Sequence, residues 1–152
     1  DTAFLGFGQI DREGNVNVSK LAGVTVGPGG FIDIAQNARN VVFCGTFDTK
    51  GTEIKTGHGK LELIKAGKVC KFVETVDQIT FSGNQALVQG QEVLYVTERA
   101  VFSLSKGGLE LVEIAPGIEI ERDVIDQMKF KPLISESIGT MNPKFFIDEE
   151  HA

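Results

Sequence analysis

Hydrophobic and polar positions follow several distinct patterns along the chain. Residues 2–10, TAFLGFGQI, are largely apolar and include two glycines. This pattern predicts a buried strand with another backbone close to its glycines. Turn-forming residues 11–15 and the alternating residues 16–19 come next. Together these segments predict a β-hairpin over residues 3–19.

A short helix and a buried strand are predicted after a glycine-rich segment. Residues 33–40, DIAQNARN, have the polar spacing of a short helix, with Asp33 or the residues before it as the N-terminal cap. Residues 41–45, VVFCG, are apolar and rich in valine, as in a fully buried strand. The order strand, glycine-rich turn, helix, strand is typical of an α/β sheet.

The second half of the chain is richer in strands. Residues 47–60 are polar and rich in glycine, which predicts a long loop. Strand regions joined by glycine-containing turns follow at 61–67, 71–83, 92–108 and 109–117, with an ambiguous stretch at 84–91. A helix is predicted at 121–128, where acidic residues near its start suit the helix dipole, and a last short strand at 131–135.

These patterns predict one domain over residues 1–152. We expect an α/β fold with a mixed sheet and helices, in which the second half of the chain is strand-rich and antiparallel in character. A length of 152 residues is enough for one domain with a sizeable core. The hydrophobic content of 41% and the charged content of 24% are ordinary for a globular protein and argue against disorder.

Charge and hydropathy exclude some partners. The net charge is −6 and the basic residues are scattered, which argues against nucleic acid or an anionic membrane surface as a partner. No apolar run approaches the roughly 20 residues of a membrane span. The acidic first residue is unlike a signal peptide, so we expect a cytoplasmic location.

The chain begins with Asp1 rather than Met, and strand-like sequence follows immediately. The ends of most domains hold a few loose residues before the first element. We therefore expect this chain to be the downstream piece of a longer protein. The alternative is a complete protein that has lost its initiator Met.

The cysteines and histidines predict no metal site. Cys44 and Cys70 both lie in apolar, strand-like runs, which favours two buried free thiols in a cytoplasmic protein. The chain has no CxxC sequence, and its two histidines, His58 and His151, lie in a glycine-rich loop and at the tail. A zinc site is therefore not expected.

Two segments could hold an anionic ligand. In GPGGF, residues 27–31, the glycines Gly29 and Gly30 precede the predicted helix, so their backbone N–H groups could face a phosphate or an oxyanion. The spacing fits neither a dinucleotide fingerprint nor a Walker loop, and a purely structural corner is an equal alternative. Lys50 follows the strand at 41–45, where open α/β sheets bind ligands, together with Thr46. A solvated loop explains that segment equally well.

Other polar residues are better explained by structure than by chemistry. Asn15 adjoins a tight turn and is expected to serve its backbone, whereas the role of Asn17 stays open. Glu98 and Arg99 lie inside apolar sequence and are predicted to form an ion pair or a turn between two strands. The sequence contains no arrangement that would support a Ser-His-Asp triad.

Several of these segments, in this order, resemble the C-terminal part of the family I coenzyme A (CoA) transferases, most closely the acetate/propionate (3-oxoacid) type. The resemblance covers nearly the whole chain and is carried by AFLGFGQIDREGNVNVSK, GPGGFIDIAQNARNVVFCGTFDTKG, VLYVTERAVFSLSKGGLELVEIAPGIE and FKPLIS. It implies transfer of CoA from an acyl-CoA to a carboxylate through a glutamyl-CoA thioester. CoA and acyl-CoA would be substrates rather than permanently bound cofactors.

The resemblance also implies roles for particular residues. Gly30, with Gly29 beside it, matches the CoA-binding glycine on the oxyanion side, and Lys50 matches a lysine that contacts CoA. Asn17 and Gln9 are weaker candidates for the CoA site. The family's nucleophile lies in a Glu-x-Gly motif, and no glutamate of this chain has glycine two positions later. An upstream segment of the same enzyme would therefore supply it, and the isolated chain is expected to be inactive.

Two other functions stay open from the sequence. A non-catalytic module that binds CoA or a sugar phosphate would use the same glycine-rich segment without a nucleophile. A sugar-phosphate isomerase is disfavoured, because nothing in the sequence resembles its acid and base. The full enzyme is expected to be a homo-oligomer.

Overall fold

A six-stranded sheet forms the centre of the protein. The computed structural model describes residues 1–18, 20–21, 24–25 and 35–147. The sheet order is β1 (Thr2–Gly6), β6 (Asn40–Cys44), β11 (Glu92–Val96), β12 (Ala100–Ser105), β13 (Gly108–Ile114) and β14 (Leu133–Thr140). Neighbours are parallel across β1, β6 and β11, antiparallel from β11 to β13, and parallel again between β13 and β14. The predicted α/β class with a mixed sheet is confirmed.

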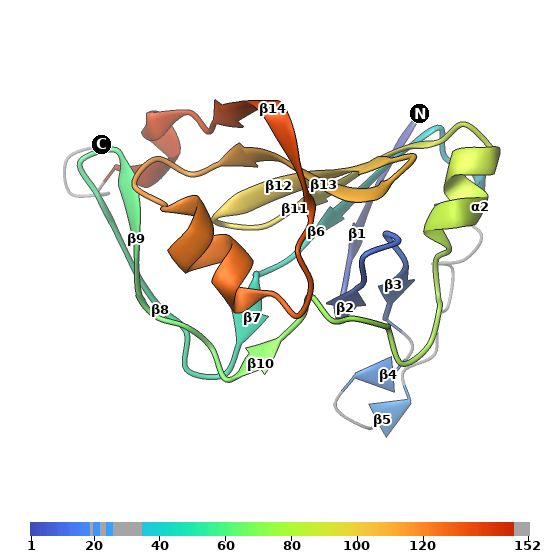
Figure 1. Cartoon of the computed structure of the whole chain (residues 1–152), viewed down its shortest axis with the longest axis horizontal. Coiled ribbons are helices and arrows are strands. Elements are labelled where there is room, and N and C mark those ends of the chain that lie inside the picture. Colours follow the sequence, from blue (N-terminus) through green and yellow to red (C-terminus); the bar gives the residue numbers. More distant parts are fainter. Residues whose placement is uncertain (19, 22–23, 26–34, 148–152) are drawn as a thin grey trace.

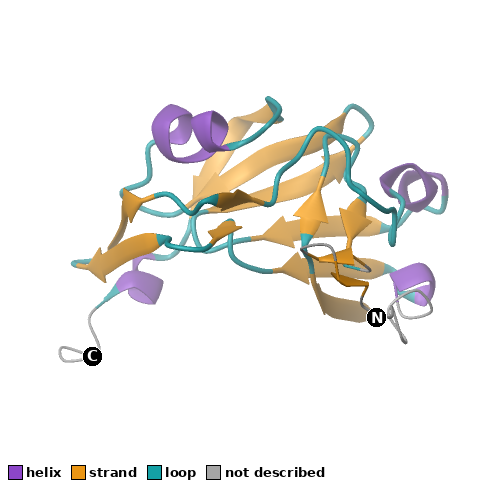
Figure 2. Cartoon of the chain, turned by 90° about the horizontal axis from the view of Figure 1, so that it is seen from below, coloured by secondary structure: helices purple, strands orange, loops and turns teal. Residues whose placement is uncertain are grey.

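Small strand pairs and short helices surround this sheet (Figure 1). The pairs are β2 (Gln9–Ile10) with β3 (Val16–Asn17), β4 (Lys20–Leu21) with β5 (Val24–Thr25), β7 (Asp48–Thr49) with β10 (Val69–Cys70), and β8 (Glu53–Gly57) with β9 (Lys60–Lys65). The helical segments are residues 35–37, α2 (Gly83–Val88), a π-helical turn η1 (Ile120–Val124), and the 3₁₀ turns η2 (Ile125–Gln127) and η3 (Pro143–Phe146). In Figure 2 these helical segments lie around the strands and form no continuous layer. No helix in the described ranges is long and apolar enough to cross a membrane.

The crossover connections between the parallel strands lie on one face of the sheet. Figure 1 shows β2, β3, β7, β10 and η1 on the same side of the central strands. Strands β1, β6 and β11 are adjacent in the sheet in the same order as in the chain, so both crossovers run in the same direction across the sheet. Right-handed crossovers that run in the same direction lie on the same face of the sheet. The core of the protein is therefore between this face and the connections.

Aromatic side chains fill that core. Phe43 of β6 stacks on Tyr95 of β11, with ring centroids 5.5 Å apart, and meets Phe81 edge-on at 5.0 Å. Phe72 contacts Phe102 of β12 at 5.0 Å. Offset and edge-on contacts of this kind are the favourable arrangements for aromatic rings. Residues of the connection from β6 to β11 are thus packed directly onto the central strands.

Helix α2 occupies the stretch that the sequence left ambiguous. Its N-terminus is capped by Ser82, whose Oγ accepts a hydrogen bond of 3.2 Å from the backbone N–H of Gln85. Glycine is required at position 83, because a Cβ there would lie 2.1 Å from the carbonyl oxygen of Glu13. The position of the helix is therefore set by this cap and by the close approach at Gly83, and not by a periodic pattern of hydrophobic residues.

Several predicted elements are corrected. The hairpin expected over residues 3–19 is confined to β2 and β3, because β1 pairs with β6 instead. The loop expected at 47–60 contains β7 and β8, which pair with β10 and β9. The helix expected at 121–128 is the π and 3₁₀ turns η1 and η2. The strand expected at 131–135 is confirmed as β14 and extends to Thr140.

The strand expected at 71–83 is mostly irregular. Phe72, Val76 and Phe81 are buried, whereas Ile79 is exposed, and the segment contacts the β2–β3 pair through isolated bridges, Ile10 with Phe72 and Val16 with Phe81. Backbone N–H groups of Val16 and Val73 donate across these bridges. The apolar pattern of residues 71–83 thus reflects burial against the β2–β3 pair, and not pairing with a neighbouring strand of the same length.

We predict that Tyr95→Phe destabilises the protein by about 1–3 kcal/mol, the cost of an unsatisfied buried acceptor. The buried Tyr95 hydroxyl donates a 2.7 Å hydrogen bond to the carbonyl oxygen of Gly14, which the substitution leaves without this donor. Urea denaturation followed by circular dichroism measures the change. Ser137→Ala, at an exposed hydroxyl of β14, is the control and should change stability by less than about 0.5 kcal/mol. Equal changes in stability for the two substitutions would show that the hydrogen bond from Tyr95 to Gly14 does not stabilise the protein.

Candidate functional site

The carboxyl ends of three parallel strands meet at one edge of the sheet. Gly6 of β1, Cys44 of β6 and Val96 of β11 are aligned in register. Ligands of open α/β sheets bind beyond such an edge. The segments that follow these residues are therefore the place to look for a functional site.

The β2–β3 hairpin follows β1 and contributes Gln9 and Asn17. Asn17 is completely buried, and its Nδ2 donates a 2.8 Å hydrogen bond to Oε1 of Gln9. The same oxygen accepts a 3.0 Å bond from the backbone N–H of Asp77, and Gln9 Nε2 donates to the Asp77 carboxylate at 3.2 Å. The two candidate residues thus form one hydrogen-bonded unit that attaches the hairpin to the connection leading toward α2.

Asn15 has the structural role that the sequence predicted. Its Oδ1 accepts a 2.9 Å hydrogen bond from the backbone N–H of Gly83, and its Nδ2 donates to the carboxylate of Asp11 at 3.2 Å. Asp11 also accepts from the backbone N–H groups of Glu13 and Asn15. These bonds hold the turn of the hairpin against the start of α2.

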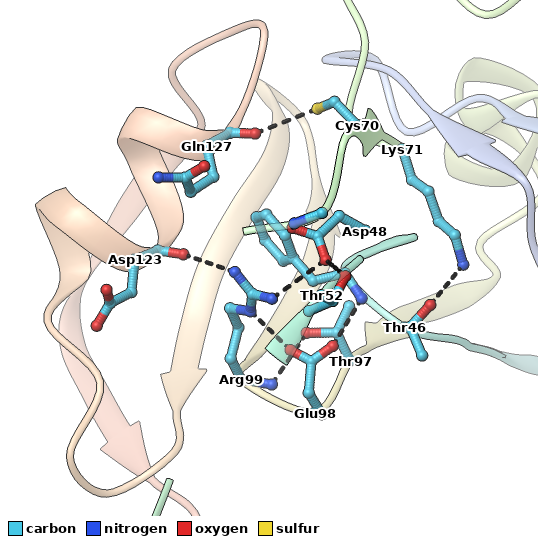
Figure 3. Close-up of polar contacts among 12 residues, drawn as sticks. Thr46, Asp48, Thr52, Cys70, Lys71, Thr97, Glu98, Arg99, Asp123 and Gln127 are labelled. Atoms are coloured by element: carbon cyan, nitrogen blue, oxygen red, sulfur yellow. Dashed lines mark hydrogen bonds and ion pairs between the residues drawn. The ribbon is translucent and has the colours of Figure 1, made fainter. Parts of the chain in front are cut away.

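A buried arginine organises the loops after β6 and β11 (Figure 3). Arg99 has no exposed surface, and its Nε donates a 2.6 Å bond to Glu98 while its Nη2 lies 3.4 Å from Asp48. Its Nη1 donates to the backbone carbonyl of Asp123 at 3.1 Å, and the guanidinium covers the Phe47 ring at 4.4 Å. The expected Glu98–Arg99 ion pair between two strands is confirmed.

The two carboxylates that bind Arg99 also accept hydrogen bonds from residues of the segment after β6. Glu98 accepts a 2.8 Å hydrogen bond from the backbone N–H of Phe47. Asp48 accepts from the Thr52 hydroxyl at 2.5 Å and from the backbone N–H of Gly67 at 3.0 Å. Both carboxylates therefore hold main chain as well as the cation. The loop that carries Lys50 is attached at both of its ends.

On the other side of Arg99, the side chain of Asp123 stabilises η1. Burial acts to raise the pKa of Asp123, but hydrogen bonds from Arg122 at 2.8 Å and from the backbone N–H of Glu119 at 2.9 Å outweigh it. The pKa therefore lies below its ordinary value, and the carboxylate is charged at neutral pH. A charged, hydrogen-bonded Asp123 keeps its backbone carbonyl in position for Arg99.

Lys71 is a cation at the same edge that the sequence did not single out. Its Nζ donates a 2.9 Å bond to the Thr46 hydroxyl and lies 5.1 Å from the centre of the Phe7 ring. Burial lowers the pKa of its ammonium group, against the carboxylates of Glu98 and Asp48, which act to raise it. The signal in the sequence is a lysine inside an otherwise apolar run, VCKFV.

The structure describes some predicted site residues and not others. Gly29 and Gly30, with the rest of GPGGF, lie outside the described residues. Lys50 is exposed between β7 and β8 and has a positive φ of 63°. The hydrogen bonds described above for the Asn17–Gln9 pair lead to Asp77 and not to Lys50.

The cysteines are free thiols, but only one is partly buried. Cys44 is exposed, because alternation along β6 directs it away from the core that holds Val41 and Phe43. Cys70 is half-buried and donates to the backbone carbonyls of Phe72 and Gln127, at 3.1 and 3.2 Å. Burial raises the pKa of its thiol. The prediction of two buried thiols is therefore wrong for Cys44.

No three His, Cys, Asp or Glu side chains in the described ranges form a cluster that could hold a metal ion. His58 is at the tip of the β8–β9 pair with a positive φ of 55°, and His151 lies outside the described residues. The polar groups described at the carboxyl edge include the carboxylates bound to Arg99, threonine hydroxyls, Lys71, and the amides of Gln9 and Asn17. Such a set can position an anionic or amide-containing ligand.

Known proteins match almost the entire chain. It is 43% identical to acetate CoA-transferase YdiF of Escherichia coli (strain K12) over 148 residues, which are 97% of this chain and 28% of that protein. It is 46% identical to caffeate CoA-transferase of Acetobacterium woodii over 154 residues, 98% of this chain and 29% of that protein. The chain is a homologue of part of the family I CoA-transferases. It spans less than a third of the length of these relatives, and no family model matches it.

A solved structure supports the relationship to CoA-transferases in three dimensions. The acyl-CoA transferase YdiF of Escherichia coli O157:H7, in a thioester complex with CoA, superposes with a TM-score of 0.93 at 43% identity. The superposition covers 97% of this chain and 29% of that one. The fold of this chain is therefore the fold that the relative has over the matched part of a much longer polypeptide.

We predict that Arg99→Met destabilises the segment by about 3–5 kcal/mol, because it leaves two carboxylates without their buried cation. Arg39→Met is the matched control, since Arg39 is exposed, and it should have little effect. Urea denaturation of the two variants beside the unaltered chain measures the difference. A loss at position 99 no larger than that at position 39 would show that the buried cation does not organise these loops.

Proposed function

We propose that the chain is part of a short-chain acyl-CoA:carboxylate CoA-transferase. The observation that carries this proposal is the similarity of nearly the whole chain to CoA-transferases, including one solved as a CoA thioester complex. The described carboxyl edge supports it, because it combines a cation, hydroxyls and a firmly held loop beside three aligned strand ends.

The proposed reaction proceeds in two reversible halves. A glutamate carboxylate attacks the thioester carbonyl of an acyl-CoA, which forms a mixed anhydride and releases the CoA thiolate. The thiolate attacks the glutamyl carbonyl, giving a glutamyl-CoA thioester and freeing the acyl group as a carboxylate. The acceptor carboxylate reverses both steps, takes the CoA and restores the glutamate. Bonds and charges balance without an oxidant or a reductant.

The nucleophile is proposed to come from a segment outside these 152 residues. No glutamate in the chain has the Glu-x-Gly spacing of the family's nucleophile. The role of this chain is then to bind CoA and to stabilise developing charge. Main-chain N–H groups at Gly29 and Gly30 would donate to the oxyanion of the thioester carbonyl.

Side chains at the carboxyl edge would complete the CoA site. Lys50 would contact CoA from the loop that Asp48 and Glu98 hold in place. Asn17 and Gln9 would contribute from the hairpin after β1, where their side chains bind each other and Gln9 binds Asp77.

The assembled enzyme is proposed to be a cytoplasmic homo-oligomer in which this chain pairs with an upstream segment. The acyl-CoA and the carboxylate are its substrates. A chain that provides binding groups without a nucleophile has no turnover of its own, so we expect activity only from the assembly.

We predict that CoA becomes covalently attached to the upstream segment and not to this chain. The assembly is incubated with an acyl-CoA in the absence of an acceptor carboxylate, and each polypeptide is weighed by intact mass spectrometry. The expected result is a CoA adduct on the upstream segment, removed by adding acetate with formation of acetyl-CoA. A CoA adduct on a glutamate of this chain would overturn the proposal, and full turnover by the isolated chain would do the same.

We predict that Lys50→Gln raises the KM for acyl-CoA about tenfold, which corresponds to a loss of about 1.4 kcal/mol of binding. The turnover number kcat should change little, because the contact exists in the ground state and the transition state alike. Lys65→Gln, which removes an exposed lysine of β9, is the control and should leave both constants unchanged. Equal KM values for the two variants would remove Lys50 from the CoA site.

A further inference from the structure

One face of the parallel part of the sheet is apolar and uncovered. Phe4 of β1, Val42 of β6 and Leu94 of β11 are aligned in register across the three strands. They point away from the core, since their neighbours along each strand, such as Ala3, are the buried residues. Phe4 is 71% exposed and Leu94 is 40% exposed. We name Phe4, Val42, Cys44, Leu94 and Val96 the open face.

A second observation shows space above the open face. Cys44 is exposed beside Gly6 and Val96, its neighbours in register. A Cβ built on Gly6 would meet no atom within 4 Å. The described part of the chain therefore leaves open the space over Gly6, on the side of the sheet where Phe4 and Cys44 are exposed.

The topology explains why the described parts of the connections do not cover this face. Strand order follows chain order from β1 through β6 to β11, and right-handed crossovers in a single direction lie on a single face. Residues of these crossovers, among them Phe72 and Phe81, pack on the opposite face with Phe43 and Phe102. Parallel strands are almost always covered on both faces. The second layer must come from chain that does not connect these strands.

The dimensions of the open face fit one helix. Strands lie about 4.8 Å apart, so Phe4 and Leu94 are about 10 Å apart across the sheet, close to the diameter of an α-helix. The row becomes polar beyond Leu94, at Ser103 and Glu110, and Glu92 is exposed at the start of β11. An amphipathic helix with an apolar stripe and basic flanks would match this surface.

We propose that the open face is the docking surface for an amphipathic helix from the remaining part of the CoA-transferase polypeptide. This inference rests on the proposed function, in which most of the enzyme lies outside the chain. The relatives are long enough to contain such a helix. The chain matches 28–29% of the length of each relative, and the rest of that polypeptide could form a covering layer. The helix would run approximately along β1, β6 and β11, with its apolar side chains between Phe4 and Leu94.

Cys44 provides a direct measurement of this contact. The full enzyme, without substrates, is treated with iodoacetamide, and the alkylation of Cys44 is followed by peptide mass spectrometry. We expect alkylation at least tenfold slower than in the 152-residue chain alone, with the same rate at every enzyme concentration. Alkylation as fast as in the chain alone overturns the inference. Protection that disappears on dilution also overturns it, because the occupant would then be a second copy.

Substitutions test the surface in the same full enzyme. Leu94→Asp should remove the protection of Cys44, whereas Val88→Asp should not, because Val88 is 76% exposed on α2 and outside the open face. Equal protection of Cys44 in both variants counts against the proposal. If Leu94→Asp prevents folding, the alkylation rate of the unaltered enzyme still decides the question.

The two proposals fail in different ways. CoA transfer is measured in the sample used for alkylation. Transfer together with an unprotected Cys44 contradicts the docking surface and leaves the proposed function intact. A protected Cys44 in an enzyme that forms no CoA adduct supports the docking surface and contradicts the proposed function.

Discussion

The burial of one cation, Arg99, imposes the arrangement on which the carboxyl edge depends. A guanidinium without access to water must be neutralised and hydrogen-bonded, and the chain meets this demand with Glu98, Asp48 and a backbone carbonyl of η1. Buried ion pairs contribute little net stability compared with apolar groups of the same size. What this one provides is geometry, since each carboxylate also accepts a hydrogen bond from a backbone N–H group. Glu98 accepts from Phe47, in the loop after β6, and Asp48 accepts from Gly67, between β9 and β10.

The same edge of the sheet gathers groups that could bind a ligand. The aligned ends of β1, β6 and β11 supply a rigid platform, and Lys71 with the Thr46 hydroxyl adds donors to it. The chain offers groups that hold and orient a ligand but no glutamate in the family's nucleophile spacing. If the proposed function holds, binding groups and nucleophile lie on different segments, and catalysis depends on their correct assembly.

The sequence predicted best the strands that place several apolar side chains in the core. The apolar run at 41–45 and the residues 92–117 became β6, β11, β12 and β13, and buried apolar residues recur along each of these strands. Strand β9 was predicted at 61–67, but its partner β8 was missed, since the residues of β8 are mostly exposed and carry no apolar alternation. Cys44 was taken as buried because an apolar run does not say which of its faces is covered. Lys71 was missed because its role comes from Thr46 and Phe7, which are distant in sequence.

Within the described part of the chain, β1 has a neighbouring strand on one side only. Natural sheets protect such edges with lysine, proline or a bulge, and Thr2–Gly6 contains neither residue and pairs with β6 without a bulge. The N–H and C=O groups on its outer side can accept a further strand, whether from the same enzyme or from another molecule. Growth of one sheet into the next therefore competes with correct assembly, and the competition becomes stronger as the protein becomes more concentrated.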